Sequence, residues 1–159
     1  MDIPYTCRIC SCQNQSPECV RVPGATRDVK DETFTVWRCS HCSTLNALES
    51  VDYPKIYKNY PIQKQKYDLF SKCMFAKRLK ILIELGLKPN HTVLDYGCGS
   101  GHFVRYLREK NYRCFGYDPF NINHCDKKVL EDRYDIVTCQ DVLEHLDEPK
   151  QLLRQLLEH

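Results

Sequence analysis

The sequence has 159 residues, of which 42% are hydrophobic and 28% are charged, and its formal net charge is +2. This length allows one modest domain plus a small module. The net charge is too small to indicate a protein that binds nucleic acid or a membrane surface. The sequence contains no run of about 18 apolar residues that would span a membrane, and its first residues lack the pattern of a signal peptide. We therefore expect a cytoplasmic protein.

Residues 1–50 contain six of the eleven cysteines, and four of these form two C-x-x-C pairs separated by 28 residues. Because the cytosol is reducing, clustered cysteines are interpreted as metal ligands before disulfides. Two such pairs complete a tetrahedral zinc site, although their usual separation is about 15–20 residues. The larger loop contains two β-rich segments, 19–22 and 34–38, with a Pro-Gly turn signal after the first. The sequence predicts a zinc-ribbon-like β module with structural zinc on Cys7, Cys10, Cys39 and Cys42.

Two further cysteines leave the ligand set open, since Cys12 or Cys19 either replaces Cys10 or stays outside the site. His41 lies inside the second pair, where we expect it to face solvent. Residues 51–61 form a proline-bounded linker. Its tyrosines either pack the module onto the next domain or line one side of a ligand pocket; they are Tyr53, Tyr57 and Tyr60.

A long helix is predicted over residues 62–86, ended by Gly86 and Pro89. Its apolar stripe is expected to include Leu69, Phe70, Cys73, Leu79 and Ile83. Eight Lys and Arg residues but one acid lie between positions 54 and 83. We favour a solvated outer face over a strip that contacts RNA or an acidic substrate.

Residues 93–103 read VLDYGCGSGHF, which predicts a strand over 92–96, a glycine turn and a helix over 101–111. Glycine tolerates positive φ and lets backbone approach a ligand, and a helix start presents free N–H groups. The spacing is G-x-G-x-G and not the G-x-G-x-x-G of dinucleotide sites, which disfavours a nicotinamide dehydrogenase. A second strand over 113–118 ends in Asp118, 23 positions after Asp95. This is close to the spacing of about 20 at which a carboxylate binds ribose hydroxyls.

Residues 120–133 form a short polar connection without a clear third strand. A buried parallel strand is predicted over 134–139 and a helix over 149–157. Between them lies the run Gln-Asp-Val-Leu-Glu-His-Leu at positions 140–146. Residues 157–159 read Leu-Glu-His, which is typical of the start of a purification tag, with native sequence as the alternative.

Three motifs in this order, at residues 93–103, 116–118 and 134–146, resemble the class I S-adenosylmethionine (SAM) methyltransferases. The run VLEH is similar to the branch that includes small-molecule, quinone and sugar methyltransferases, some of which carry an N-terminal C-x-x-C module. The resemblance implies an α/β fold, a Rossmann-like doubly wound sheet, after the zinc module. It also implies methyl transfer from SAM to a small molecule such as a sugar or phenolic metabolite.

Position by position, the resemblance implies a set of cofactor-binding residues at the carboxyl ends of the strands. The methionine part of SAM would contact the acid and glycines of the turn, and Asp118 would bind the ribose. Gln140 and Asp141 would lie near the sulfonium. His145 either packs at a helix start or acts as a general base. The turn residues are Asp95, Gly97, Gly99 and Gly101.

The family fold has seven strands, whereas this sequence supplies about four. We expect residues 62–157 to be the N-terminal part of the methyltransferase domain in a truncated chain; the alternative is a natural half-domain completed by dimerisation through the exposed edge strand. An RNA or protein methyltransferase, or a non-catalytic module that binds zinc and SAM, remains a functional alternative.

Overall fold

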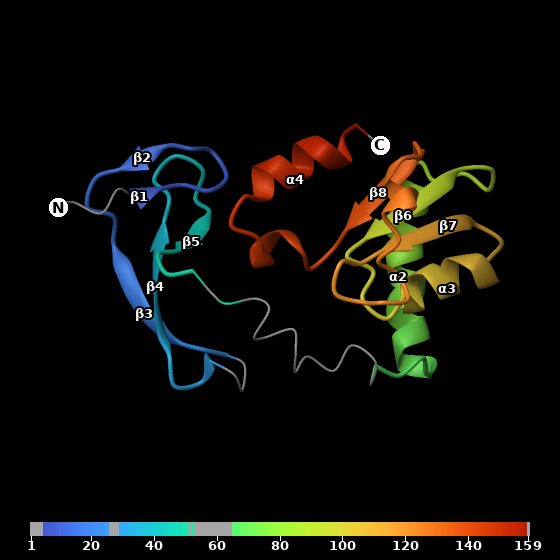
Figure 1. The fold of residues 1–159 in the computed structure, drawn as a ribbon, viewed down its shortest axis with the longest axis horizontal. Coiled ribbons are helices and arrows are strands. Elements are labelled where there is room, and N and C mark those ends of the chain that lie inside the picture. Colours follow the sequence, from blue (N-terminus) through green and yellow to red (C-terminus); the bar gives the residue numbers. More distant parts are fainter. Residues whose placement is uncertain (1–4, 26–28, 51, 53–64, 159) are drawn as a thin grey trace. The chain divides into compact units, whose positions relative to one another are not determined.

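The computed structural model describes residues 5–25, 29–50, 52 and 65–158. The chain divides into two compact units, Met1–Tyr60 with His145–Leu153, and Pro61–Glu144 with Arg154–His159. Figure 1 labels their helices and strands. The tyrosines predicted to form the linker lie outside the described residues.

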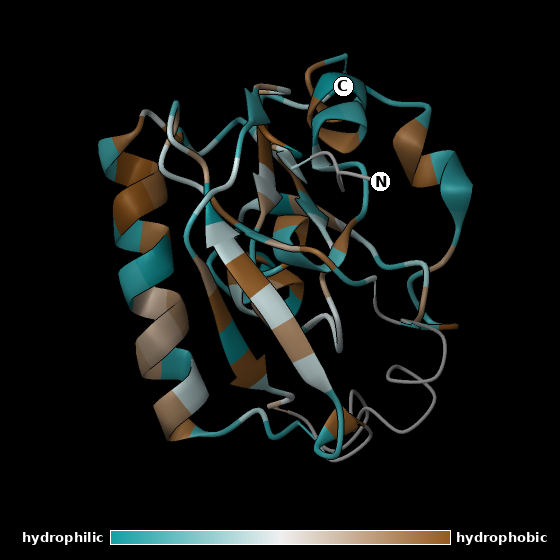
Figure 2. Ribbon diagram, turned by 90° about the vertical axis from the view of Figure 1, so that its left-hand side faces the viewer, coloured by the Kyte–Doolittle hydropathy of each residue, from teal (hydrophilic) through white to brown (hydrophobic). Residues whose placement is uncertain are grey.

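The first unit is built from short antiparallel strands. Strand β1 pairs with β2, and β3, β4 and β5 form a second sheet in that order. Cys19 of β3 lies opposite Trp37 of β4, so the two predicted β segments pair with each other. Apolar and polar residues alternate along most of β4 (Thr33–Arg38), and Figure 2 shows strands that are banded in this way. The strands are β1 (Tyr5–Thr6), β2 (Gln13–Asn14), β3 (Cys19–Pro23), β4 (Thr33–Arg38) and β5 (Leu45–Ala47).

The apolar core of this unit is small. Its buried residues are Cys7, Trp37 and Cys39, and the ring of Tyr5 packs edge-on against Trp37 at a centroid distance of 5.5 Å. Two of the three buried side chains are thus thiols from the predicted metal site. Modules with so little buried apolar area usually need a metal ion, disulfides or oligomerisation for stability.

The second unit contains a three-stranded, all-parallel sheet in the order β7-β6-β8. This topology confirms the predicted α/β class and the Rossmann-like parallel sheet. Residues 118–135, between β7 and β8, contain only a short 3-10 helix, η3, and no strand. The elements of this unit are α2 (Leu69–Glu84), β6 (Thr92–Tyr96), α3 (His102–Glu109), β7 (Arg113–Tyr117), η3 (Lys127–Leu130) and β8 (Ile136–Cys139). η4 (Leu143–His145) and α4 (Pro149–Leu156) follow, and residues 145–153 in them belong to the first unit.

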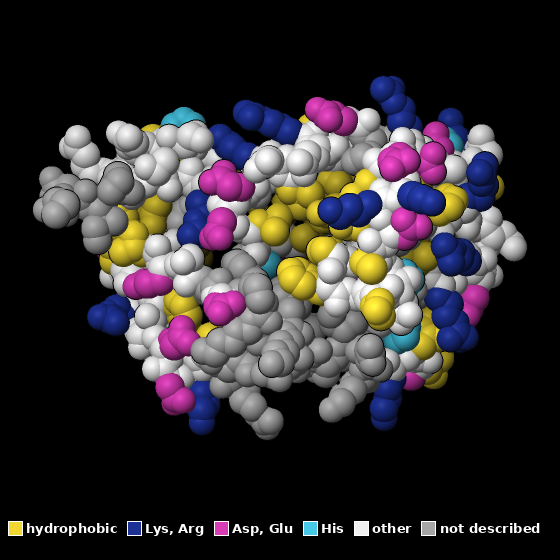
Figure 3. Space-filling model, viewed as in Figure 1, with side chains coloured by type: hydrophobic (Ala, Val, Ile, Leu, Met, Phe, Trp, Pro, Cys, Tyr) yellow, Lys and Arg dark blue, Asp and Glu magenta, His cyan; other side chains and the backbone are white. Residues whose placement is uncertain are grey.

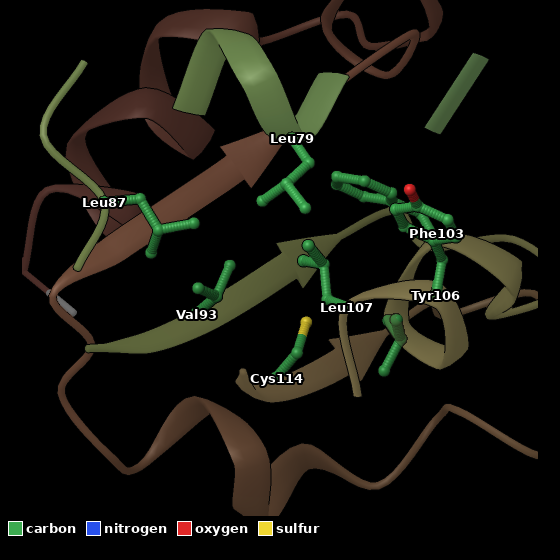
Figure 4. Packing of buried hydrophobic residues seen from close by; sticks show 8 residues of the cluster. Leu79, Leu87, Val93, Phe103, Tyr106, Leu107 and Cys114 are labelled. Atoms are coloured by element: carbon green, nitrogen blue, oxygen red, sulfur yellow. The ribbon is translucent and has the colours of Figure 1, made fainter. Parts of the chain in front are cut away.

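The core of the second unit lies where α2 and α3 cover the sheet (Figure 4). Val93 of β6 and Leu107 of α3 have no exposed surface. Burying such side chains contributes about 1.5–3 kcal/mol each. The cluster consists of Leu79, Leu87, Val93, Phe103, Val104, Tyr106, Leu107 and Cys114.

Helix α2 begins at Leu69, seven residues later than predicted, because Asp68 caps it. The Asp68 carboxylate accepts the Ser71 N–H at 2.9 Å, and the Ser71 hydroxyl oxygen accepts the Asp68 N–H at 2.9 Å. This reciprocal pair is a capping box, which stops the helix from extending backwards. Residues 65–68 are accordingly not helical. The predicted end is confirmed: Gly86 has a φ of 106° directly after the last turn.

The predicted apolar stripe of α2 is wrong in most of its members. Leu69 and Phe70 are 84% and 76% exposed, and Ile83 is also exposed. Leu79 is buried, and Phe75 and Leu82 pack against the same core. Apolar residues occur on every side of this helix, so their spacing alone did not select the buried side.

Strand β8 pairs with β6 alone among the described residues, so it lies at an edge of the sheet. Self-association through this edge stays a prediction. Within the described parts of the chain, no helix is long and apolar enough to cross a membrane.

Candidate functional site

The glycine turn between β6 and α3 has the conformation that its sequence predicts. Gly97, Gly99 and Gly101 have φ values of 76°, 55° and 73°. A Cβ at Gly97 would collide with Val142, and one at Gly101 with the ring of His124. A Cβ at Gly99 would meet no atom within 4 Å. The backbone at Gly99 therefore borders open space, as a ligand cradle requires.

Asp118, which follows β7, is joined to this turn by a direct hydrogen bond. Its carboxylate accepts the N–H of Gly99 at 2.9 Å and that of Phe120 at 2.9 Å. The side chain is buried, at 7% exposure. Each carboxylate oxygen keeps a further lone pair for another donor. The structure thus brings Asp118 together with the glycine turn, as the chain spacing predicts.

The loop after Asp118 also contacts the turn, which the sequence analysis did not predict. The buried Asn121 donates its side-chain amide to the Gly99 carbonyl at 2.6 Å and accepts the Asn123 N–H at 3.0 Å. The carbonyl of His124 accepts the Asp118 N–H at 2.9 Å, which folds the loop back over Gly101. The available signal was Asp-Pro-x-Asn, a pattern in which Asp and Asn side chains bond nearby backbone.

Asp95 ends up beneath the turn, next to β8. It is 7% exposed and accepts the hydroxyl of Thr138 at 2.7 Å. The pKa of Asp95 is raised to about 6, chiefly by burial and in part by the nearby Asp118, while the Thr138 hydrogen bond and the Arg78 charge oppose the rise. A buried carboxylate at the end of a parallel strand is a candidate acceptor for a cationic or hydroxylic ligand group.

Gln140 and Asp141 follow β8 and are both exposed. Asp141 adopts a φ of 55° and forms an ion pair with Arg78 of α2 at 3.7 Å. A left-handed conformation in a non-glycine residue at a strand end marks a constrained turn. His145 is the last residue of η4 and is exposed. A role for His145 as a general base stays a prediction.

The residues just before α2 also contact the glycine turn, which the sequence did not predict. The Ser100 hydroxyl donates to the Gln65 side-chain oxygen at 2.8 Å, and a His102 ring nitrogen lies 2.9 Å from the Gln65 carbonyl. Two residues later, the Tyr67 hydroxyl donates to Glu109 at 2.6 Å. The chain that leads into α2 therefore contacts both ends of α3.

In the first unit, the four predicted metal ligands converge. The sulfur atoms of the two C-x-x-C pairs all lie within 4.8 Å of one another. Cys7 and Cys42 approach to 3.6 Å between sulfurs, and Cys10 and Cys39 to 3.5 Å. Four thiolates at a Zn–S distance of about 2.3 Å would be about 3.8 Å apart. The donor set therefore fits tetrahedral zinc.

Neighbouring cysteines stay outside this group. Cys12 contacts the Gln13 carbonyl and Cys19 the Pro17 carbonyl, and His41 is exposed as predicted. Within the group, the Cys42 N–H lowers the pKa of the Cys39 thiol to about 6, helped by further N–H donors and opposed by burial. A thiol that is readily deprotonated is suited to metal ligation.

The family model for a methyltransferase domain matches residues 67–159, which is more than half of the chain. The chain belongs to this methyltransferase domain family. No curated protein matches it significantly. The match contains β6, the glycine turn, Asp118 and β8, so the geometry described above lies within the methyltransferase domain.

Three of the four basic residues of α2 have partners within the methyltransferase domain. Lys72 lies over the ring of Tyr67, Arg78 pairs with Asp141, and Lys80 pairs with Glu84. On the face shown in Figure 3, Lys and Arg side chains are interspersed with Asp and Glu. Cations mixed with carboxylates in this way are expected on a solvated outer face.

Proposed function

We propose that this chain binds SAM at the glycine turn and belongs to an enzyme that transfers the methyl group to a small-molecule acceptor. The contact between Asp118 and the N–H of Gly99 carries the proposal, because it places a buried carboxylate beside a backbone that borders open space. The methyltransferase family supports the same cofactor.

Each residue of the site has a role suited to its chemistry. Asp118 binds the ribose hydroxyls through its remaining lone pairs. The open backbone at Gly99 and the buried Asp95 hold the methionine part, and Gln140 and Asp141 lie toward the sulfonium. The turn residues Gly97 and Gly101 keep the backbone in the required conformation.

When bound, SAM supplies a methyl group that its sulfonium has already activated. The protein then has to orient the acceptor and exclude water, and needs no nucleophile of its own. His145 would act as a general base only for acceptors that lose a proton. The resemblance of the VLEH run supports a small-molecule acceptor. RNA docking is not supported by α2, because three of its cations contact groups within the domain.

Calorimetric titration with SAM and S-adenosylhomocysteine tests this proposal. We expect micromolar binding that Asp118→Asn weakens at least about 10-fold. The variant keeps one oxygen for the Gly99 N–H, but it turns an amide donor toward the Phe120 N–H and loses the charge toward hydroxyl donors. Glu131→Gln makes the same carboxylate-to-amide change at an exposed position and should bind like wild type. Folded wild-type chain without affinity for either compound would contradict the proposal.

We also propose that Cys7, Cys10, Cys39 and Cys42 hold a structural Zn²⁺ ion. The convergence of four sulfurs supports this, and a complete set of four protein ligands is typical of structural and not catalytic sites.

A further inference from the structure

The two halves of the cysteine group are copies of one sequence pattern. Residues 7–14 read CRICSCQN and residues 39–46 read CSHCSTLN, so both follow the pattern C-x-x-C-S-x-x-N. Only the cysteines have a role in the proposed zinc site. The pattern repeats two further residue types at matching positions, a serine and an asparagine.

The backbone repeats as well. In the first copy, the Cys7 N–H donates to the Cys12 carbonyl and the Ser11 N–H donates to the Cys7 carbonyl. In the second copy, the Cys39 N–H donates to the Thr44 carbonyl and the Ser43 N–H donates to the Cys39 carbonyl. The two serines share a left-handed conformation, with φ values of 58° and 63°.

The two asparagines cross between the copies in a reciprocal arrangement. The Asn14 side-chain oxygen accepts the Ser40 N–H at 2.8 Å, and the Asn46 side-chain oxygen accepts the Arg8 N–H at 3.0 Å. Each of these donors directly follows the first cysteine of the opposite copy. Both asparagines are buried, at 9% and 5% exposure.

The amide nitrogens of the same asparagines approach the sulfurs of the opposite copy. Nδ2 of Asn14 lies 3.7 Å from Sγ of Cys39, and Nδ2 of Asn46 lies 3.7 Å from Sγ of Cys7. Each nitrogen also donates to a carbonyl of its own copy, at 3.2 and 3.0 Å. Each amide therefore bridges the two copies with all of its polar atoms engaged.

We propose that Asn14 and Asn46 are matched positioning residues of the metal centre, each donating an N–H to one thiolate from outside the ligand set. Four thiolates around Zn²⁺ leave a net negative charge, and buried N–H donors stabilise it. Such second contacts also fix the ligand orientation, and losing one typically costs about 10- to 100-fold in metal affinity. This inference rests on the proposed zinc site.

Asn14→Asp and Asn46→Asp separate this role from a merely structural one. Each variant keeps the oxygen that accepts the opposite backbone N–H, but it replaces the donor beside the sulfur with a charged acceptor. Gln13→Glu is the matched control, because it makes the same amide-to-carboxylate change at an exposed neighbour on β2. Zn²⁺ affinity is measured by chelator competition, and the site is loaded with Co²⁺ to record the thiolate-to-cobalt band.

We expect each aspartate variant to bind Zn²⁺ at least about 10-fold more weakly than wild type and to shift the thiolate-to-cobalt band. Because the two copies are equivalent, both variants should show similar losses, and Gln13→Glu should match wild type. Aspartate variants with unchanged affinity and an unchanged cobalt spectrum overturn the asparagine proposal alone. A wild-type chain without a thiolate-to-cobalt band overturns the zinc centre as well.

A measurement on the wild-type chain covers variants that fail to fold. With NMR-active cadmium in the site, the side-chain amide protons of Asn14 and Asn46 should show scalar coupling to the metal through the N–H···S contacts. The absence of coupling at both amides in a cadmium-loaded, folded chain overturns the proposal.

Discussion

At the scale of single residues, the methyltransferase unit buries two carboxylates with different surroundings. Asp118 accepts two backbone N–H groups, whereas Asp95 accepts one hydroxyl. Burial accordingly raises the pKa of Asp95 to about 6. A charged Asp95 at neutral pH therefore costs stability, which a ligand that bonds to it would recover.

Replacing Asp95 with asparagine should stabilise the unit at pH 7 but weaken SAM binding. The protonated carboxyl favours the folded state below about pH 4, and this contribution is lost as the pH rises to about 6. A rise from 3.8 to about 6 corresponds to about 3 kcal/mol at most. Urea unfolding followed by far-UV circular dichroism should show a gain of about 2–3 kcal/mol at pH 7 and almost none at pH 3.5.

The control for this experiment is a second variant, measured at the same two pH values. Glu131→Gln removes an exposed carboxylate charge from the same unit and should leave the free energy of unfolding within about 0.5 kcal/mol of wild type at both pH values. An Asp95→Asn chain that is less stable than wild type at pH 7 would show that the charged form is favoured in the folded state.

At the scale of elements, α2 shows how tertiary contacts select one side of a helix. Its sequence carries apolar residues all around, and only the contact with α3 and β6 determines that Leu79 is covered while Leu69 is not. The start of the helix, by contrast, is local. Asp68 and Ser71 bond each other's backbone and need no other element.

Two leucine variants test this assignment of the buried side. Leu79→Ala should lower the free energy of unfolding by about 2–5 kcal/mol, because it leaves a cavity among α2, α3 and β6. Leu69→Ala makes the same change at a side chain that is 84% exposed and should cost less than about 0.5 kcal/mol. Equal losses of unfolding free energy in the two variants would show that Leu69 is buried as well, as the apolar spacing predicts.

At the scale of the whole molecule, the interactions that stabilise each unit differ. The core cluster of the methyltransferase unit has eight buried residues, whereas that of the first unit consists of Trp37 and two thiols. A hydrophobic core of the second kind cannot offset the conformational entropy of its loops. The stability of the first unit should therefore depend on metal.

Removing zinc should unfold the first unit and leave the second folded. Structural zinc contributes roughly 10–16 kcal/mol of apparent free energy in small modules. Trp37 is the sole tryptophan of the chain, so its fluorescence reports on the first unit. A chelator should shift this emission to the red while the helical signal in circular dichroism is kept. Unchanged emission after complete metal removal would show that the module folds without metal.

The sequence by itself determined the features that depend on local chemistry. Glycine spacing predicted the turn, the spacing of Asp118 from Asp95 predicted which strand ends meet, and two C-x-x-C pairs predicted that four cysteines converge. The first two depend on glycine conformation and on parallel strands placing their carboxyl ends together, and the third on the ability of each C-x-x-C pair to place two thiols on one ion.

Only the tertiary structure decided which further residues join each site. Gln65 reaches the glycine turn through a fold of the chain that no spacing specifies. The patterns that contain Asn121 and Asn14 do not say which distant groups these amides contact, namely Gly99 and Cys39. Asparagine and glutamine are common in loops, so their presence carries little signal. A buried amide finds its partners only after the elements have packed, because its hydrogen bonds depend on groups distant in sequence.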